Sequence, residues 1–267
     1  MQEANVIGLI PAAGKATRLA PLPCSKEILP IGYDELQSKG KHSPKVAIQY
    51  LIDAMLAAGI SEQHIVLRQG KWDVPSYLEN LTESSAQFAY HVLRDSLSSV
   101  HSLDKAYPFI RDKVVALGFP DILLGCVPVY QPILNELKTT KADIVLALFP
   151  AEQPDLVDMV ELDKENNVLA IEIKPNKTAL SQTWGAAVWQ NSFTEFIHDC
   201  VGNADFGENA VGREPHIGDV IGVAIAHGFS IKAVKVSDVP YLDIGTPSNL
   251  VAAVRANRRQ ADFRNGN

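Results

Sequence analysis

Short apolar runs alternate with longer amphipathic runs along the first half of this chain. The short runs are rich in Val, Ile and Leu, as is typical of buried strands, and the longer ones repeat apolar residues at helical spacing. In chain order the segments read VIGLI, PKVAIQYLIDAMLAAG, HIVLR, QFAYHVL, KVVALG, VYQPILNELK and ADIVLALF. Strands that alternate with helices are joined by crossovers, so this pattern predicts an α/β fold whose mixed, mostly parallel central sheet is flanked by helices.

The helix expected over residues 46–58 shows helical spacing most clearly. Its apolar stripe consists of Ile48, Leu51, Ile52, Met55 and Leu56. Gly59 stands where a C-terminal cap is expected. A stripe of this kind indicates that the helix packs against the rest of the domain with one face.

The pattern changes after residue 151. VDMVELD and VLAIEIKP, separated by the turn KENN, predict a β-hairpin elaboration in the second half. TWGAAVWQ and IKAVKV predict strands, HIGDVIGVAIAHG predicts a helix, and Pro247 suits the first turn of a last helix. Because no linker rich in Pro, Gly or Ser divides the chain, we expect one domain over residues 1–260, with residues 261–267 as a frayed tail.

The charge and the cysteines bear on partners and compartment. A net charge of −7 argues against binding to nucleic acid or to an anionic membrane, but it allows a local cationic pocket for a small phosphate. The sequence shows no apolar run of membrane length and no signal peptide, so we expect a cytoplasmic protein without membrane association. The three cysteines, Cys24, Cys126 and Cys200, have no metal-ligand spacing and indicate a reducing compartment. A homo-oligomeric state stays open.

The loop PAAGKATRLAPLPCSKEILP follows the first expected strand and has the composition of an anion-binding loop. It does not match the P-loop, because five residues separate Gly8 from Gly14 and Ala16 stands where a hydroxyl would hold magnesium. It also lacks the G-x-G-x-x-G fingerprint of dinucleotide-binding proteins. The loop therefore belongs to neither of these two phosphate-binding motifs.

The small residues of this loop allow a ligand to approach the backbone. Ala12, Ala13 and Gly14 can present N–H groups to it. Arg18 can grip two phosphate oxygens with its planar fork, and Lys26 can act as a point charge. The alternative is a capping turn with solvated cations.

Two aspartates follow strand-like runs, at the sheet edge where α/β proteins bind ligands. Asp121 comes after VVALG, and Asp243 lies between a strand-like segment and a Gly-Thr-Pro turn. Carboxylates at such positions can share a magnesium ion that bridges to substrate phosphates. The alternative for each is a turn or helix-cap aspartate.

Four segments resemble the sugar-1-phosphate nucleotidylyltransferases. IPAAGKATRLAPLPCSKEILPI is similar to the signature loop of that family, in which a small-residue turn precedes Gly-Thr-Arg-Leu and then Lys-Glu or Lys-Pro before Leu-Pro. SPKVAIQYLIDAMLAAGI resembles its next helix, IEIKP its Glu-Lys-Pro strand, and YLDIGTPSNLVAA the segment with its late metal-binding aspartate. The resemblance covers most of the chain and implies a Rossmann-like, GT-A-like nucleotide-diphospho-sugar transferase fold in a single domain.

The resemblance implies transfer of a nucleotidyl group from an NTP to a sugar 1-phosphate with release of pyrophosphate. UTP or dTTP is favoured as donor and glucose 1-phosphate as acceptor, because the opening motif is most similar to enzymes that make UDP-glucose or dTDP-glucose. The resemblance implies that the catalytic residues are Arg18, Lys26 and Asp121. It implies that Mg²⁺ is bound by Asp121 and Asp243. The residues implied to bind the nucleotide are Ala12, Ala13, Gly14, Lys15, Ser98 and Ser99. Those implied to bind the sugar phosphate are Lys174, Glu172 and Gly185.

The sequence departs from the family pattern at several positions. Ala16 replaces a glycine, Phe119-Pro120 precedes Asp121 where Gly is usual, and Ile173 replaces the Glu that directly precedes the family lysine. Such departures also suit a non-catalytic relative that binds a nucleotide sugar and acts as a regulatory subunit. A nucleotidyltransferase of the same fold with a non-sugar phosphorylated acceptor is a third possibility. Both aspartates and both loop cations are present, which favours the enzyme.

Overall fold

A computed structural model describes residues 5–36, 41–81, 84–95, 98–125, 128–203 and 214–264. Cys126 and residues 265–267 lie outside this part of the chain. The other segments that the sequence pattern singled out as strands or helices lie inside it.

Nine strands form the central sheet, and two further pairs of short strands lie beside it. The sheet strands are β1 (Val6–Ala12), β4 (Glu62–Arg68), β5 (Gln87–Leu93), β6 (Val114–Gly118), β8 (Ile144–Pro150), β9 (Asp158–Leu162), β10 (Val168–Ile173), β11 (Gln182–Trp189) and β12 (Ile231–Lys235). The pairs outside it are β2 (Pro30–Leu36) with β3 (Lys41–Val46), and β7 (Ile122–Leu123) with β13 (Leu242–Asp243).

The order in the sheet is β10-β9-β11-β6-β1-β4-β5, with β8 paired to both β11 and β12. The first half is parallel, since β1 pairs with β4 and β6 and β4 pairs with β5 in the same direction. Strand β11 runs antiparallel to both β6 and β8, and it joins the parallel part to the hairpin β9–β10. The predicted mixed, mostly parallel sheet and the predicted hairpin are confirmed.

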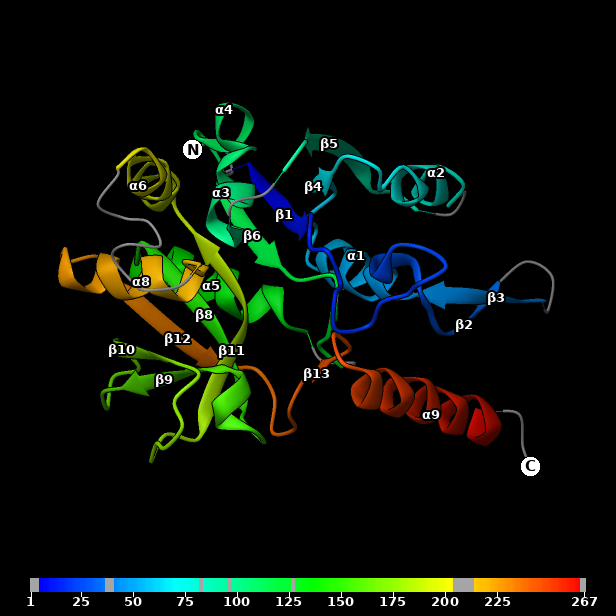
Figure 1. The fold of residues 1–267 in the computed structure, drawn as a ribbon. Coiled ribbons are helices and arrows are strands. Elements are labelled where there is room, and N and C mark those ends of the chain that lie inside the picture. Colours follow the sequence, from blue (N-terminus) through cyan, green and yellow to red (C-terminus); the bar gives the residue numbers. More distant parts are fainter. Residues whose placement is uncertain are drawn as a thin grey trace.

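Helices cover both faces of this sheet, which is why strands such as β1 are apolar almost throughout (Figure 1). The longer helices are α1 (Ala47–Ala57), α5 (Tyr130–Thr140), α6 (Asn191–Gly202), α8 (Ile217–Ala226) and α9 (Pro247–Arg264). Shorter ones are α2 (Asp73–Leu78), α3 (Ser99–Asp104), α4 (Tyr107–Ile110), and the single turns η1 (Lys26–Ile28) and η2 (Pro154–Leu156). None of the helices in the described part of the chain is both long enough and apolar enough to cross a lipid bilayer.

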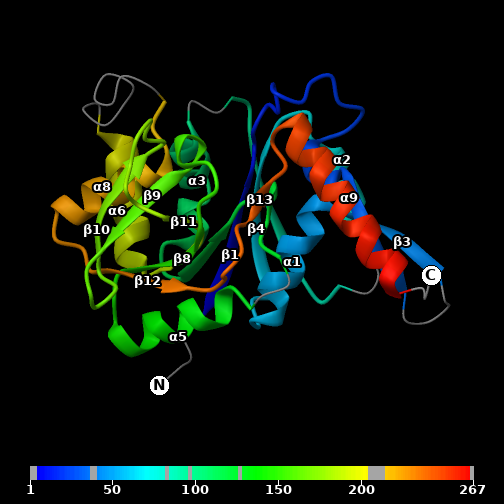
Figure 2. The ribbon, with the colours of Figure 1, turned by 90° about the horizontal axis from the view of Figure 1, so that it is seen from below.

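The core has two layers, one on each face of the sheet. Apolar residues of α1 and α5 pack on one face, and those of α3, α6 and α8 pack on the other. Figure 2 shows α6 and α8 at one end of the molecule, with α9 and the β2–β3 hairpin at the opposite end. The predicted apolar stripe of α1 lies in the first layer, and its residues Ile48, Leu51, Ile52 and Met55 are at most 1% exposed.

One feature differs from the sequence expectations. The segment between the opening loop and α1 forms the β2–β3 hairpin, which the apolar pattern did not predict. Helix α9 spans Pro247–Arg264, and the domain boundary expected at residue 260 stays a prediction. A single α/β domain with the expected elements is otherwise what the structure shows.

Candidate active site

The short β7–β13 ladder brings the two predicted metal-binding aspartates to one place. Asp121 directly precedes β7, and Asp243 is the last residue of β13. In the ladder Asp243 pairs with Ile122, and the backbone N–H of Ile244 donates to the carbonyl oxygen of Asp121 at 2.9 Å. The ladder thus joins a loop at the carboxyl end of β6 to the segment that precedes α9.

Lys26 extends from the turn η1 to Asp121. Its Nζ lies 2.5 Å from Oδ2 of Asp121, and both side chains are largely buried. A Cβ built on Gly14 would lie 3.8 Å from the same Nζ, so the ammonium group sits directly below the opening loop. Burial lowers the pKa of Lys26, but the charge and hydrogen bond of Asp121, with the charges of Glu27 and Asp243, raise it above its ordinary value.

Asp243 approaches Arg18. Its Oδ1 accepts a hydrogen bond from the backbone N–H of Gly245 at 2.6 Å, and its Oδ2 lies 4.0 Å from Nη2 of Arg18. Burial, followed by the negative charge of Asp121, raises the pKa of Asp243 above its ordinary value. Arg18, Lys26, Asp121 and Asp243, which the sequence singled out in three distant segments, therefore form one cluster.

A buried ion pair holds the opening loop from below. Nζ of Lys71 donates to both carboxylate oxygens of Glu27 at 2.8 Å and to the carbonyl oxygen of Ala12 at 2.7 Å. The Glu27 residue is fully buried. Burial raises the pKa of Glu27, and the positive charge of Lys71 opposes that shift. Burial lowers the pKa of Lys71, and the negative charge of Glu27 opposes that shift. Sequence reasoning missed this pair, although Glu27 stands in the quoted loop.

A groove of ≈ 400 Å³ runs between the opening loop and the loop after β4. It is open to solvent and carries several cations, and its lining residues are Gly14, Lys15, Ala16, Ala20, Leu22, Pro23, Cys24, Ser25, Lys26, Arg68, Gln69, Gly70, Lys71 and Asp73. Gly14 and Lys15 thus line the groove, whereas Ala12 and Ala13 are buried and are not among its lining residues. This groove is large enough and cationic enough for the phosphates of a nucleotide.

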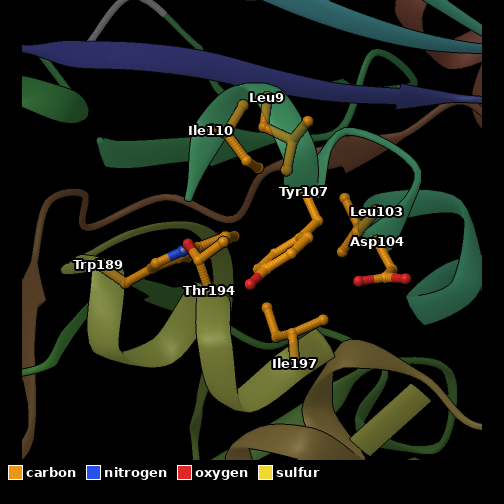
Figure 3. A pocket seen from close by; sticks show the side chains of 8 residues that line it. All are labelled: Leu9, Leu103, Asp104, Tyr107, Ile110, Trp189, Thr194 and Ile197. Atoms are coloured by element: carbon orange, nitrogen blue, oxygen red, sulfur yellow. Dashed lines mark hydrogen bonds between the residues drawn. The ribbon is translucent and has the colours of Figure 1, made fainter. Parts of the chain in front are cut away.

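A second cavity, of ≈ 10 Å³, lies inside the core between β1, α4 and α6. Figure 3 shows the ring of Tyr107 among the side chains of Leu103, Thr194 and Ile197 at this position. The cavity holds at most about one water molecule and is no substrate site.

Ser98 and Ser99 have structural partners at the start of α3. The Oγ of Ser98 accepts a hydrogen bond from the backbone N–H of His101 at 3.0 Å and so caps the helix. The Oγ of Ser99 lies 3.4 Å from the carbonyl oxygen of Pro215. Within the described part of the chain neither serine lines the groove, so nucleotide contact by them stays a prediction.

The residues predicted to bind the sugar phosphate lie on β10 and β11. Lys174 directly follows β10, is exposed, and has a positive φ of 45°. Glu172 is exposed as well. Gly185 lies at a register shift of β11, where an added Cβ would come within 2.9 Å of the Tyr241 ring and 3.1 Å of Phe149. Close packing explains this glycine, and its predicted place under the sugar stays untested, as do the roles of Lys174 and Glu172.

The donor set suits a magnesium ion. No group of three or more His, Cys, Asp or Glu side chains in the described residues is placed to hold a metal. Asp121 and Asp243 offer two carboxylates, and they are close enough for Asp121 to raise the pKa of Asp243. Mg²⁺ is usually held by one or two carboxylates together with substrate phosphates and water, so the pair fits this ion.

Comparisons with known proteins identify the family and the fold. The chain matches the family model described as nucleotidyl transferase over residues 7–260, and it belongs to that family. The expected family and fold are thereby confirmed.

Two curated relatives are UTP–glucose-1-phosphate uridylyltransferases. The protein of Escherichia coli (strain K12) is 26% identical over a stretch that covers 43% of this chain and 43% of the relative. For the protein of Klebsiella pneumoniae the identity is 28%, with 46% of each chain covered. The chain thus spans less than half the length of the curated relatives it matches.

Solved structures share the fold over nearly the whole chain. A Bacillus anthracis protein assigned as a glucose-1-phosphate thymidylyltransferase has a TM-score of 0.80 at 19% identity, with 95% of each chain covered. A UDP-glucose pyrophosphorylase complexed with UDP-glucose has a TM-score of 0.78 at 19% identity, covering 97% of this chain and 100% of the other.

Proposed function

We propose that this chain transfers a nucleotidyl group from an NTP to a sugar 1-phosphate and releases pyrophosphate. UTP or dTTP is the preferred donor and glucose 1-phosphate the preferred acceptor. The observation that carries the proposal is the cluster of Lys26, Asp121, Asp243 and Arg18, of which Lys26 also lines the cationic groove. The family match supports it, and the curated relatives are named for UTP and glucose 1-phosphate.

The reaction needs little acid or base chemistry. An oxygen of the sugar phosphate, already anionic, attacks the α-phosphorus of the NTP. The bond from that phosphorus to the oxygen bridging to the β-phosphorus then breaks, and its electrons leave with pyrophosphate. The protein must hold two polyanions in line and neutralise the charge that grows on the leaving group.

The cations of the cluster supply this charge. Lys26 sits below Gly14 and reaches the α-phosphate, while Arg18 binds oxygens of the β- and γ-phosphates with its planar fork. The backbone from Ala12 to Lys15 holds the nucleotide, and the segment at Ser98 and Ser99 lies near the base or ribose.

Asp121 and Asp243 would hold Mg²⁺. When bound, this ion would lower the repulsion between the phosphates and stabilise charge on the leaving pyrophosphate. In the acceptor half, Lys174 anchors the sugar phosphate, and Glu172 and Gly185 lie beside the sugar.

Release of pyrophosphate from the common NTPs against a panel of sugar 1-phosphates tests the proposal. We expect release with UTP or dTTP that requires both a sugar 1-phosphate and Mg²⁺. Tight binding of a nucleotide sugar without any turnover would favour the regulatory relative instead. Turnover with a phosphorylated alcohol alone would favour a non-sugar acceptor.

A further inference from the structure

Arg68 is the last residue of β4 and stands beside the start of the opening loop. In the parallel pairing of β1 with β4, Ala12 lies opposite Leu67, so both strands end at the same edge of the sheet. The backbone N–H of Lys71 donates to the carbonyl oxygen of Arg68 at 3.1 Å and closes the turn after the strand. Gly70 provides a positive φ of 97° within this turn. The fold therefore places Arg68 at the edge of the sheet where α/β proteins bind ligands.

Arg68 lines the groove between the opening loop and the loop after β4, together with three other cations. These are Lys15, Lys26 and Lys71. Two of them, Lys26 and Lys71, belong to the ion pairs described above. Among the residues that the structure describes, no acidic side chain lies at ion-pair distance from Arg68 or from Lys15. The positive charge of these two side chains is therefore available to an anion in the groove.

The acidic residue in the lining of the groove, Asp73, is engaged by the opening loop. Its Oδ2 accepts a hydrogen bond from the backbone N–H of Ser25 at 2.7 Å, and its Oδ1 accepts one from the Oγ of Ser25 at 2.8 Å. Both carboxylate oxygens thus fix the loop to the first residue of α2. The groove therefore keeps an excess of positive charge.

The guanidinium group of Arg68 has N–H donors without partners in the described part of the chain. The residue is partly exposed, and its Nε is buried without a hydrogen bond to any described residue. The terminal nitrogens Nη1 and Nη2 are not buried, and they too make no hydrogen bond within these residues. A buried N–H without a partner destabilises a folded protein, so its presence at a groove calls for a functional reason.

We propose that Arg68 binds the terminal phosphates of the NTP and the pyrophosphate formed from them. This assignment rests on the proposed function, in which Lys26 reaches the α-phosphate. Because Lys26 and Arg68 line the same groove, the phosphates beyond the α-phosphate can extend to the guanidinium group. Its planar fork can donate two N–H groups to phosphate oxygens.

The lining of the groove also separates Arg68 from the other binding residues. Arg18 is not among the lining residues, so Arg68 is an additional arginine for the phosphates. The residues proposed for the acceptor, Lys174, Glu172 and Gly185, do not line the groove either. We therefore expect Arg68 to affect the donor and not the sugar 1-phosphate.

Arg68→Met tests the assignment, because it removes the charge and all the donors but keeps an unbranched side chain. The probes are UTP or dTTP, whichever the wild type binds more tightly, the corresponding monophosphate, and pyrophosphate, each measured by calorimetry with Mg²⁺. We expect the Kd for the triphosphate and for pyrophosphate to rise about tenfold or more. The Kd for the monophosphate and the KM for glucose 1-phosphate should not change.

The stability of the variant separates phosphate binding from a structural role. Since the Nε of Arg68 has no partner among the described residues, its removal takes away a buried group that opposes folding. The urea midpoint of Arg68→Met without ligand should therefore equal or exceed that of the wild type. Arg111→Met is the matched control, since Arg111 is exposed and does not line the groove. It should leave all the binding constants unchanged.

Arg68→Lys gives a second route if Arg68→Met does not fold. It keeps the charge but not the fork, so the Kd for the triphosphate should rise severalfold and that for the monophosphate should not. In either folded variant, an equal loss of affinity for triphosphate and monophosphate would overturn the proposal, because it would place Arg68 at the base, the ribose or the α-phosphate.

The wild type distinguishes the failure of this assignment from that of the proposed function. If the wild type bound no NTP, the proposed function would fail with it. If the wild type and Arg68→Met bound the triphosphate equally well, only the assignment of Arg68 would fail.

Discussion

The roles of individual residues follow from how charge is paired around Asp121 and Asp243. Lys26 partly neutralises Asp121, whereas Asp243 has a backbone N–H and a more distant Arg18. Asp121 is thus held by a buried ammonium group, whereas Asp243 is held by a backbone N–H and a more distant guanidinium group.

Replacement of either aspartate by asparagine tests the metal assignment. We expect Asp121→Asn and Asp243→Asn each to lower turnover by at least about a hundredfold, because each loses a charged ligand where charge develops. Steady-state rates at saturating Mg²⁺ measure the effect. Near-normal turnover in either variant would remove that residue from the metal site.

Arg18→Lys tests the phosphate assignment of the opening loop. A lysine keeps the positive charge but cannot present two parallel N–H groups to phosphate oxygens, so we expect about a tenfold or larger loss in kcat/KM for the NTP. Arg111→Lys, a change at another arginine whose residue is exposed, serves as the control. If Arg18→Lys kept both the affinity and the rate, the residue would be a solvated surface cation.

Among single residues, the sequence singled out those that belong to local motifs. Arg18, Lys26 and Asp121 could be singled out because they lie in segments that follow strand-like runs. The partner of Glu27 could not, since Lys71 comes from a loop that is far away in sequence.

Among the elements, the turn η1 and the loop before α2 are joined by the buried pair of Glu27 and Lys71. A buried pair contributes little by itself, but removal of one partner leaves an uncompensated charge. We expect Lys71→Met to lower the free energy of unfolding by about 3 to 5 kcal/mol in urea titrations.

Two further variants control this prediction. Lys235→Met breaks the exposed pair of Lys235 with Asp238, and its effect should stay within about 1 kcal/mol. Combining Glu27→Leu with Lys71→Met should restore part of the loss, since no buried charge remains. A Lys71→Met protein as stable as the wild type would show that the pair does not hold the opening loop.

The elements of the fold were predicted well where periodicity is strong and poorly where it is weak. The apolar runs of β1, β4, β6 and β8 and the stripe of α1 were read from residue spacing alone. The β2–β3 hairpin was not, because its second strand carries Lys41, His42, Ser43 and Pro44 instead of an apolar alternation. Such a strand is stabilised by pairing with its neighbouring strand, and a local sequence pattern does not show that pairing.

At the scale of the whole molecule, a buried histidine pair couples stability to pH. His64 on β4 and His91 on β5 lie with Nδ1 and Nε2 2.8 Å apart, and Nε2 of His64 lies 3.0 Å from Glu62. Burial, followed by the nearby His64, lowers the pKa of His91 to about 4. Its neutral form is therefore the one that the folded protein accepts.

The sign of the effect follows from proton binding. Between pH 6.5 and about 4 the unfolded chain protonates His91 while the folded chain does not, so stability falls as the pH falls through this range. The loss attributable to His91 reaches about 3 kcal/mol at most. Urea titrations from pH 7 to pH 4 should show a shallower decline for His91→Asn than for the wild type. Parallel pH profiles for the two proteins would contradict this.

The overall architecture was predictable because alternating strands and helices admit few arrangements. Right-handed crossovers and a buried parallel sheet follow from the pattern, and the carboxyl ends of the strands then become the place for a site. The convergence of Asp121 and Asp243 was less accessible, since it depends on the two-residue ladder β7–β13, too short for any periodicity.

The central claim is that this cluster transfers a nucleotidyl group to a sugar 1-phosphate. The most direct measurement uses UTP or dTTP labelled at the α-phosphorus, incubated with glucose 1-phosphate and Mg²⁺, and follows where the label goes. The account predicts that the label appears in a nucleotide sugar, with pyrophosphate released in equal amount, and that Asp121→Asn abolishes the transfer. Label that stays in the NTP, or that appears only as free nucleoside monophosphate with every sugar 1-phosphate tried, would contradict it.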